Sequence, residues 1–355
     1  MSCLLYPPAA AQTKRRVKVD KVVTISDVAQ AAGVSKATVS YVLSNDKRIS
    51  KQTAEKVQRT IDDLGYTVNH AARALSTKRS NVLGIVSPTH HGVYLSSFFG
   101  LHIYLLSEYA TRSGYDSMFI GSDDGCDAMR KAAASHKVDG FILMDVCDND
   151  PRMTTANEIG IPTVVFGSPI SSFGLDTVDS DFRSEAARCM QRIAADNHKE
   201  VILYSWSNSI FEKRMGFALR FRDQIAQSAK DLGIILHIYS PDNDESDTAG
   251  ELLHALHLYP HATAMIIHNE SASIIAPQAF SSRGIQIPDD LYVISVFPKQ
   301  MQWSVLASFA FIQTDIDQLA QKIVSTLVAR IQDPDAPITR SLLDFTLQQP
   351  VSKQH

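Results

Sequence analysis

Cysteine is scarce in this chain of 355 residues, and the few that occur are scattered. They form no C-x-x-C pair and no spacing typical of metal ligands: Cys3, Cys126, Cys147 and Cys189. The sequence therefore predicts neither a disulfide framework nor a zinc site. This use of cysteine is typical of a reducing compartment.

Long apolar runs are also missing. No segment approaches the roughly 20 apolar residues that a membrane span needs, so we expect no membrane partner. The apolar residues 3–6 precede the basic residues 14–16, which is the reverse of the order in a secretory signal. We therefore expect a cytoplasmic protein.

Motifs for catalysis and nucleotide binding are absent as well. Neither G-x-x-x-x-G-K-[ST] nor G-x-S-x-G occurs. His254, His257 and His261 lie close together in sequence, but Pro260 interrupts the segment and no carboxylate or cysteine is suitably placed to complete a metal site. We expect no enzyme, no cofactor and no metal.

Positive charge is concentrated at the N-terminus. The first 79 residues carry 14 Lys and Arg against 6 Asp and Glu, whereas the chain as a whole has a net charge of -4. A compact basic segment can neutralise phosphates, while an acidic one would be repelled by a duplex. The N-terminal part is therefore the candidate nucleic-acid surface, with an ordinary solvated face as the alternative.

Two kinds of pattern divide the chain. Residues 1–21 show no periodicity, which indicates a flexible basic arm. From Thr24 to about Tyr66 the pattern is helical: a short helix broken by Gly33, a second capped by Ser35, and a third capped by Ser50. We assign residues 22–67 to a helical DNA-binding head.

Beyond residue 81, short apolar runs alternate with helical stretches. Such runs are typical of buried parallel strands, and at least eight of them favour two doubly wound sheets. The runs are 82–86, 117–120, 140–144, 163–166, 201–204, 234–238, 264–267 and 292–296.

Residues 24–43 read as a helix, a turn centred on glycine and a second helix, the order of a helix-turn-helix. At 100° per residue, Val39, Val42 and Leu43 fall on one side of the second helix, where they would pack on the first. Lys36, Ala37, Ser40 and Tyr41 project from the opposite side. The alternative is a generic three-helix bundle.

The same string resembles the N-terminal domain of LacI/GalR-type regulators, whose pattern T-I-x-D-V-A-x-x-A-G-V-S-x-x-T-V-S-x-V-L it matches at every fixed position. The resemblance implies that this chain forms a homodimer and that the homodimer binds an operator in double-stranded DNA. Ala37 cannot hydrogen-bond a base but could touch a thymine methyl. The residues that the resemblance places at the DNA are Thr24, Ser35, Lys36, Ala37, Thr38, Ser40 and Tyr41.

Residues 68–80 resemble the hinge helix and linker of that family. The family pattern Y-x-P-N-x-x-A-R-x-L is matched from Tyr66 except that Val68 replaces the proline. The resemblance implies that Asn69 and Arg73 contact DNA and that Leu75 enters the minor groove, where an apolar wedge partly unstacks a base step. Packing of Leu75 on the head is the alternative.

For residues 81–355 the resemblance is carried by weaker motifs, among them Val138-Asp139-Gly140 and Gly216-Phe217. It implies an effector-binding and dimerisation domain with two Rossmann-like subdomains, as in periplasmic binding proteins. Small ligands bind in the cleft between two such subdomains, at the carboxyl ends of the strands. The expected effector is a sugar or a related metabolite.

The resemblance also implies which residues of this chain occupy the positions of the family's effector site. Phe98 or Phe99 could stack on a ligand ring, Asn269 matches a residue that bonds ligand hydroxyls, and Lys213 or the adjacent Arg214 stands where the family has an arginine. Phe297 stands where the family has an aspartate, which favours a more apolar ligand or the loss of an effector.

The predicted function is that of a sequence-specific transcriptional regulator controlled by a small molecule. We expect it to be a repressor. Two alternatives stay open. The body alone would also suit the solute-binding protein of a transporter, although the basic head argues against that function. A regulator controlled by a partner protein is the other.

Overall fold

The computed structural model describes residues 23–43, 48–66, 79–88, 97–242, 247–298 and 308–348. The chain divides into two compact units, which we call the head, Met1–Ser76, and the body, Thr77–His355. The predicted basic arm lies outside the described residues, as does most of the predicted hinge.

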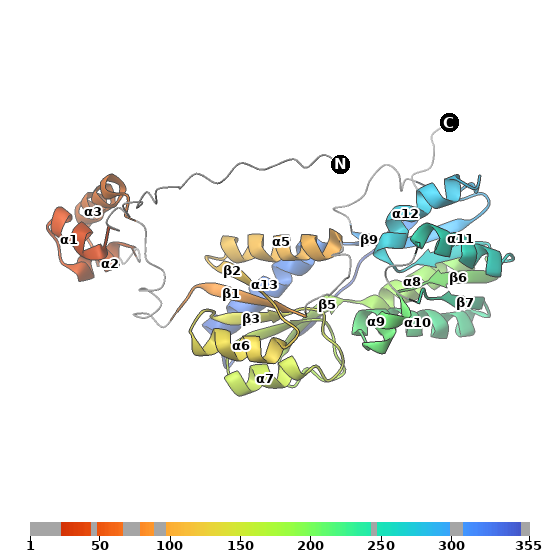
Figure 1. Ribbon diagram of the computed structural model, residues 1–355, viewed down its shortest axis with the longest axis horizontal. Coiled ribbons are helices and arrows are strands. Elements are labelled where there is room, and N and C mark those ends of the chain that lie inside the picture. The colour runs from red at the N-terminus through yellow and green to blue at the C-terminus, as the bar shows by residue number, and fades with distance from the viewer. Residues whose placement is uncertain are drawn as a thin grey trace, which may run out of the picture. The chain divides into compact units, whose positions relative to one another are not determined.

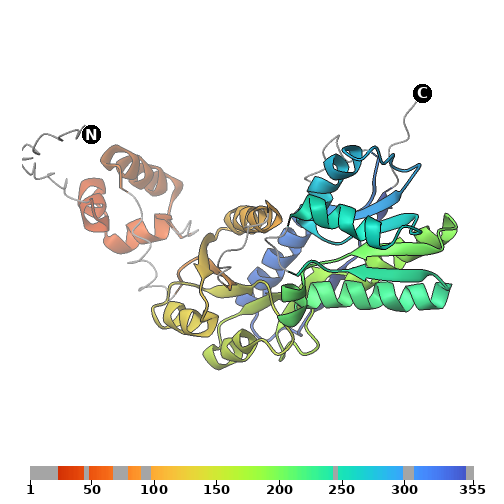
Figure 2. The same ribbon diagram turned by 45° about the vertical axis from the view of Figure 1, so that its right-hand side comes forward.

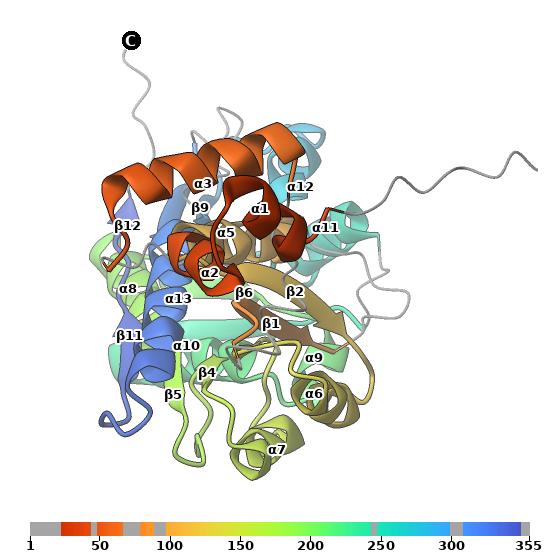
Figure 3. The same ribbon diagram turned by 90° about the vertical axis from the view of Figure 1, so that its left-hand side faces the viewer.

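The described part of the head folds into α1 (Ile25–Ala32), α2 (Lys36–Leu43) and α3 (Lys51–Leu64) (Figures 1 and 3). Local capping sets the ends of these helices. Thr24 accepts a hydrogen bond from the backbone N–H of Asp27, whose carboxylate in turn accepts one from the Thr24 N–H at 2.8 Å. Gly33 ends α1 at a φ of 64°, which suits glycine.

A small apolar core joins the three helices of the head. Val28, Ala32, Val39 and Val57 are fully buried, and Val42 and Leu43 pack against them from α2. The predicted division of α2 into a buried and an outward side is thus confirmed.

The body contains two six-stranded sheets among the described residues. The first has the order β11-β5-β4-β3-β1-β2 and the second the order β12-β10-β9-β8-β6-β7. All neighbours are parallel except β10 and β12. The strands are β1 (Val82–Ser87), β2 (Asp116–Gly121), β3 (Gly140–Leu143), β4 (Thr163–Phe166), β5 (Asp176–Ser180), β6 (Glu200–Tyr204), β7 (Ile235–Tyr239), β8 (Ala264–Ile267), β9 (Tyr292–Pro298), β10 (Ala310–Thr314), β11 (Arg340–Leu343) and β12 (Leu347–Gln348).

Helices cover both faces of each sheet (Figures 1 and 2). In the first subdomain α5 packs with α13, and α6 packs with α7; in the second, α8 packs with α10, and α11 packs with α12. The helices of the body are α5 (Ser97–Arg112), α6 (Gly125–Ala134), α7 (Pro151–Ile159), α8 (Phe182–Ala195), α9 (Asn208–Glu212), α10 (Gly216–Leu232), α11 (Thr248–Leu258), α12 (Glu270–Ser281) and α13 (Ile316–Gln332). The predicted pair of Rossmann-like subdomains is confirmed.

The chain passes between the subdomains three times: from β5 to α8, from β10 to α13, and from β11 to β12. The strands that precede the first two crossings end beside the space between the sheets. Parallel strands place their carboxyl ends at one edge, so the loops of both subdomains meet there. This arrangement positions the cavity described below.

Candidate functional site

The outward side of α2 is a small polar and aromatic surface. Lys36, Ala37, Ser40 and Tyr41 are exposed, whereas Val39 between them is fully buried. The Tyr41 ring is 39% exposed, and the guanidinium of Arg48 lies 4.7 Å from its centre. Four of the seven predicted DNA-facing residues of the head thus share one exposed face.

The other three have partners within the head. Thr24 caps α1, and the Ser35 hydroxyl accepts from the N–H of Thr38 at 3.0 Å. The hydroxyls of Ser35 and Thr38 are 2.9 Å apart. These side chains therefore hold the ends of α1 and α2. Three predicted hinge residues lie outside the described residues: Asn69, Arg73 and Leu75.

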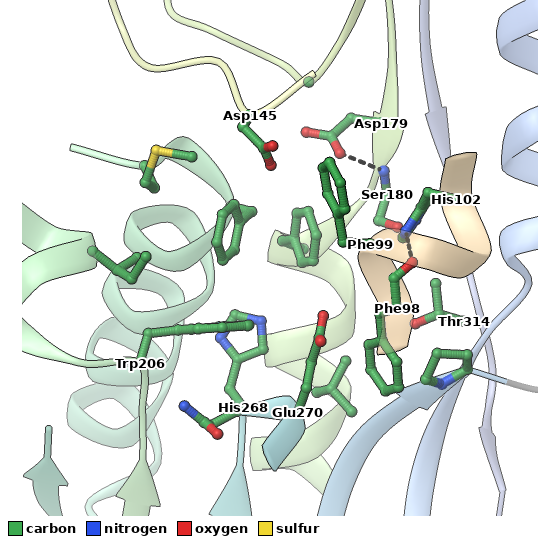
Figure 4. Close-up of a pocket in the computed structure, with 18 of the residues that line it drawn as sticks. Phe98, Phe99, His102, Asp145, Asp179, Ser180, Trp206, His268, Glu270 and Thr314 are labelled. Atoms are coloured by element: carbon green, nitrogen blue, oxygen red, sulfur yellow. Dashed lines mark hydrogen bonds between the residues drawn. The ribbon is translucent and has the colours of Figure 1, made fainter. Parts of the chain in front are cut away.

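A cavity of about 300 Å³ lies between the two sheets of the body (Figure 4). It is formed where β3, β4 and β5 of the first subdomain and β6, β8 and β9 of the second end, as expected for a cleft at strand carboxyl ends. Its walls are strongly aromatic. The aromatic side chains that line it are Phe98, Phe99, Phe166, Phe182, Tyr204, Trp206 and Phe217, with the imidazoles of His102 and His268.

An ion pair crosses the cavity wall between the subdomains. Arg220 of α10 donates to the carboxylate of Asp179 at the end of β5, and also to the backbone oxygen of Ser168 at 2.6 Å. Burial raises the pKa of Asp179 to about 6, and the charge of Arg220 opposes that rise. The guanidinium is thus held by two groups of the opposite subdomain.

His268 and Trp206 bring polar nitrogens into this aromatic surrounding. The His268 ring stacks on Phe221 at 3.9 Å, and burial lowers its pKa to about 3, so the imidazole is neutral at pH 7. Its Nδ1 and the Nε1 of Trp206 are buried and have no hydrogen-bond partner within the part of the chain that the structure describes. Both residues line the cavity.

The structure brings some of the predicted effector residues together. Phe98, Phe99 and Asn269 line the cavity. The amide oxygen of Asn269 accepts from the N–H of Ala272 at 2.9 Å and caps α12, so that oxygen is already engaged.

Lys213 and Arg214 do not line the cavity, and this part of the predicted site needs correction. Lys213 is exposed at the end of α9, and Arg214 is exposed and lies 4.0 Å from Asp148. The cation of the cavity is Arg220, one turn inside α10, because that position of the helix faces the first subdomain.

Phe297 is fully buried in β9 and does not line the cavity, although its neighbours Val296 and Pro298 do. Its ring meets that of Phe98 edge to face at 5.2 Å. Phe297 therefore supports the wall from behind.

Sequence reasoning missed Asp179, Trp206, Arg220 and His268 as cavity residues. A signal was available for two of them, because His268 comes directly after one apolar run that was predicted as a strand and Trp206 comes two residues after another. Over the described residues, no group of three or more His, Cys, Asp or Glu side chains could hold a metal ion, and no helix is long and apolar enough to cross a membrane.

Two family models match the chain. Residues 24–69 match the model for bacterial regulatory proteins of the lacI family, and residues 191–349 match the model for a periplasmic binding protein-like domain.

Curated relatives agree with these models. MalR of Staphylococcus xylosus, an HTH-type transcriptional regulator, is 32% identical over 51% of this chain and 55% of its own length, so that match spans about half of the relative. Catabolite control protein A of Staphylococcus epidermidis is 28% identical over 77% of this chain and 82% of its own length. The transcriptional regulator CelR of Thermobifida fusca is 22% identical over 91% and 96%.

Solved structures share the fold. The Lac repressor bound to ONPG is 20% identical with a TM-score of 0.78, over 94% of this chain and 100% of the other. The complex of CelR with cellobiose is 18% identical with a TM-score of 0.63, over 93% and 99%.

Fold and site together define a two-part protein, with a helix-turn-helix head and a body like a periplasmic binding protein. The chain carries the DNA-binding domain of the lacI family and a periplasmic binding protein-like domain, and its relatives are regulators of the LacI family.

Proposed function

We propose that this regulator binds a pseudo-palindromic operator as a homodimer and that a small molecule in the cavity of the body changes its affinity for that operator. The observation that carries the proposal is the exposed face of α2, where Lys36, Ala37, Ser40 and Tyr41 lie opposite the buried Val39. A helix enters the major groove in this way, with one side held by its own domain and the other free for bases.

The exposed side chains suit base contacts of different kinds. Lys36 can donate to guanine O6 and N7, and Ala37 can touch a thymine methyl. One helix reads only a few base pairs, so a specific site needs two heads, and two-fold symmetry in the protein is mirrored in the operator. The Lac repressor dimer, whose structure bound to operator shares the fold of this chain, supports this arrangement. We propose the cytoplasm as its location, because a regulator of this kind acts on chromosomal DNA.

The hinge would connect effector to operator. Asn69, Arg73 and Leu75 would contact DNA there, with Leu75 in the minor groove. An effector that contacts both subdomains shifts their equilibrium only by its difference in affinity for the two states. The structure of CelR in complex with cellobiose supports a sugar or a related metabolite as the first class of effector to test.

The decisive experiment is selection of DNA from a random pool by the purified full chain, followed by sequencing and by sedimentation of the complex. We expect a pseudo-palindrome bound by two chains. Enrichment of single asymmetric half-sites bound by one chain would contradict the proposal, and enrichment of no sequence would remove specific DNA binding. Titration calorimetry with a panel of sugars and nucleosides then tests control by a small molecule; a regulator controlled by a partner protein would bind none of them.

A further inference from the structure

The cavity between the sheets offers little to a ligand with many hydroxyl groups. Several of its polar side chains already have partners within the protein: Asp179 holds Arg220, Asn269 caps α12, and the Ser207 hydroxyl lies 2.9 Å from the Ser209 hydroxyl. His102 Nδ1 is 2.7 Å from the backbone oxygen of Phe98. Each hydroxyl of a polyol that lost water without gaining a partner would weaken binding.

Two buried nitrogens, in contrast, have no hydrogen-bond partner among the residues that the structure describes. These are Nδ1 of His268 and Nε1 of Trp206, and His268 is 4% exposed. Their rings lie nearly perpendicular, with centres 6.1 Å apart, so the two nitrogens belong to one region of the wall. Buried polar atoms in proteins almost always have partners, and both of these residues line the cavity.

The remaining wall is made of flat rings. Phe98 and Phe99 come from α5, and Phe217 comes from α10 on the other side of the cleft. In the view of Figure 4, Trp206 and Phe98 lie on opposite sides of the cavity, and His268 lies between them. Aromatic rings arranged in this way favour stacked or edge-to-face contacts with another ring.

The charges of the wall indicate the charge of the ligand. Among the described residues that line the cavity, the carboxyl groups are those of Asp145, Asp179 and Glu270, whereas Arg220 is the one guanidinium and no lysine occurs. Both lining imidazoles have pKa values lowered by burial. An anionic ligand would therefore meet excess negative charge in a cavity of low dielectric.

We propose that the effector is an uncharged aromatic heterocycle or aryl compound, stacked among the phenylalanines of the cleft, whose polar edge bonds His268 and Trp206. This inference rests on the proposed function, because it identifies the class of ligand for the effector site. It separates the protein from relatives such as CelR, whose structure is a complex with cellobiose.

The test is calorimetric titration of the full chain with matched probes. Nicotinamide, adenine and indole-3-carboxamide are uncharged aromatic compounds with a polar edge; nicotinate and indole-3-carboxylate have the same rings with a negative charge; cellobiose and maltose are polyols. We expect at least one uncharged aromatic probe to bind, its carboxylate counterpart, where there is one, to bind at least tenfold more weakly, and the sugars not to bind.

Variants locate the ligand. Trp206→Phe and His268→Phe keep an aromatic ring and delete the nitrogen, so each should weaken the best probe about tenfold, as loss of one buried hydrogen bond does. His261→Phe is the matched control, because His261 is exposed and does not line the cavity. Trp206→Phe is the more conservative variant should His268→Phe fail to fold.

The outcomes are separable from those of the proposed function. Binding of a sugar in preference to every aromatic probe would overturn this inference and leave the effector site in place. Binding of no probe, or unchanged binding by Trp206→Phe and His268→Phe, would also overturn it. None of these results affects the selection of operator DNA, which tests the proposed function independently.

Discussion

At the scale of single residues, Tyr41 is the clearest candidate for base recognition. Its ring is 39% exposed on the outward face of α2, and Arg48 lies against it without covering it. The pair can present an aromatic surface and a positive charge together, so the ring and the guanidinium are expected to act as a unit.

Tyr41→Ala should therefore weaken binding to the selected operator by about 1–3 kcal/mol and relax the choice of base at one position. Binding to unrelated DNA should hardly change, since phosphates carry it and tyrosine has no charge. Fluorescence anisotropy with both duplexes at one fixed salt concentration measures the two affinities. Equal losses on both would make Tyr41 a backbone contact.

Glu185 is a second informative residue, for stability. It is fully buried on α8, and neither carboxyl oxygen has a hydrogen-bond partner within the part of the chain that the structure describes. Burial raises its pKa from 4.5 to about 8, and the nearby charge of Asp179 adds to the rise. The folded protein therefore holds this proton over a pH range in which the unfolded chain has lost it.

The sign of the pH effect follows from that difference. Because the native state binds the extra proton between about pH 4.5 and 8, this group makes unfolding easier as pH rises through that window, by at most about 1.4 kcal/mol per pH unit. Glu185→Gln should consequently stabilise the body, with a gain that grows from pH 5 to pH 8 and then levels off. Melting curves across this range test it, with the exposed Glu212→Gln as control; a gain that does not change with pH would refute the argument.

At the scale of elements, the capping of helix ends contributes to the stability of the head. Thr24 was predicted to face DNA, yet its hydroxyl is engaged in the cap of α1 together with Asp27. Thr24→Ala should lower the free energy of unfolding of the head by about 0.5–2 kcal/mol, whereas Thr24→Ser should keep most of it. Thermal melting of the full chain measures this loss. If Thr24→Ala melts normally but binds operator poorly, the hydroxyl acts at the DNA and the cap is unimportant.

Elements governed by local signals could be predicted from the sequence. The three helices of the head have a capping residue or a glycine close to their ends, such as Gly33 and Ser50, and the eight apolar runs all became strands. β5 was not predicted as a strand, because its sequence pattern is polar. Asp176 is buried there with partners from far along the chain: Arg330 donates to it at 2.8 Å and the Thr339 N–H at 2.7 Å.

The residues of the cavity, too, could be predicted from the sequence only in part. Trp206 and His268 follow predicted strands and could be found by position, but the cation could not. Counting back from Gly216-Phe217 pointed to Lys213, whereas the side chain that reaches the cleft is that of Arg220. Which turn of α10 faces the other subdomain depends on packing between sheets, and no local pattern records that packing.

At the scale of the whole body, the contacts between subdomains set how easily the cleft opens. The chain crosses between the two subdomains three times. Arg220 adds hydrogen bonds from α10 to Asp179 and to the backbone oxygen of Ser168 in the first subdomain. Arg214 and Asp148 lie 4.0 Å apart at another point across the cleft. The guanidinium of Arg220 is the more buried of the two, so it is less screened by solvent and its loss should matter more.

Arg220→Gln should therefore shift the body toward an open cleft. The change leaves Asp179 without its charge partner, and breaking a buried pair of this kind is strongly unfavourable for the conformation that contains it. The separation can be followed by electron spin resonance between labels on α6 and α11, introduced as Lys131→Cys and His257→Cys after replacement of the native cysteines. We expect a longer distance in Arg220→Gln than in the parent protein.

Arg222→Gln is the matched control, because Arg222 lies on the same helix and pairs with its neighbour Asp223, so its loss should leave the distance unchanged. Asp179→Asn combined with Arg220→Gln should return the distance part of the way, since no unpaired charge then remains. An unchanged distance in a folded Arg220→Gln protein would show that the ion pair does not hold the cleft closed, and the chain crossings and apolar contacts would have to set the equilibrium instead.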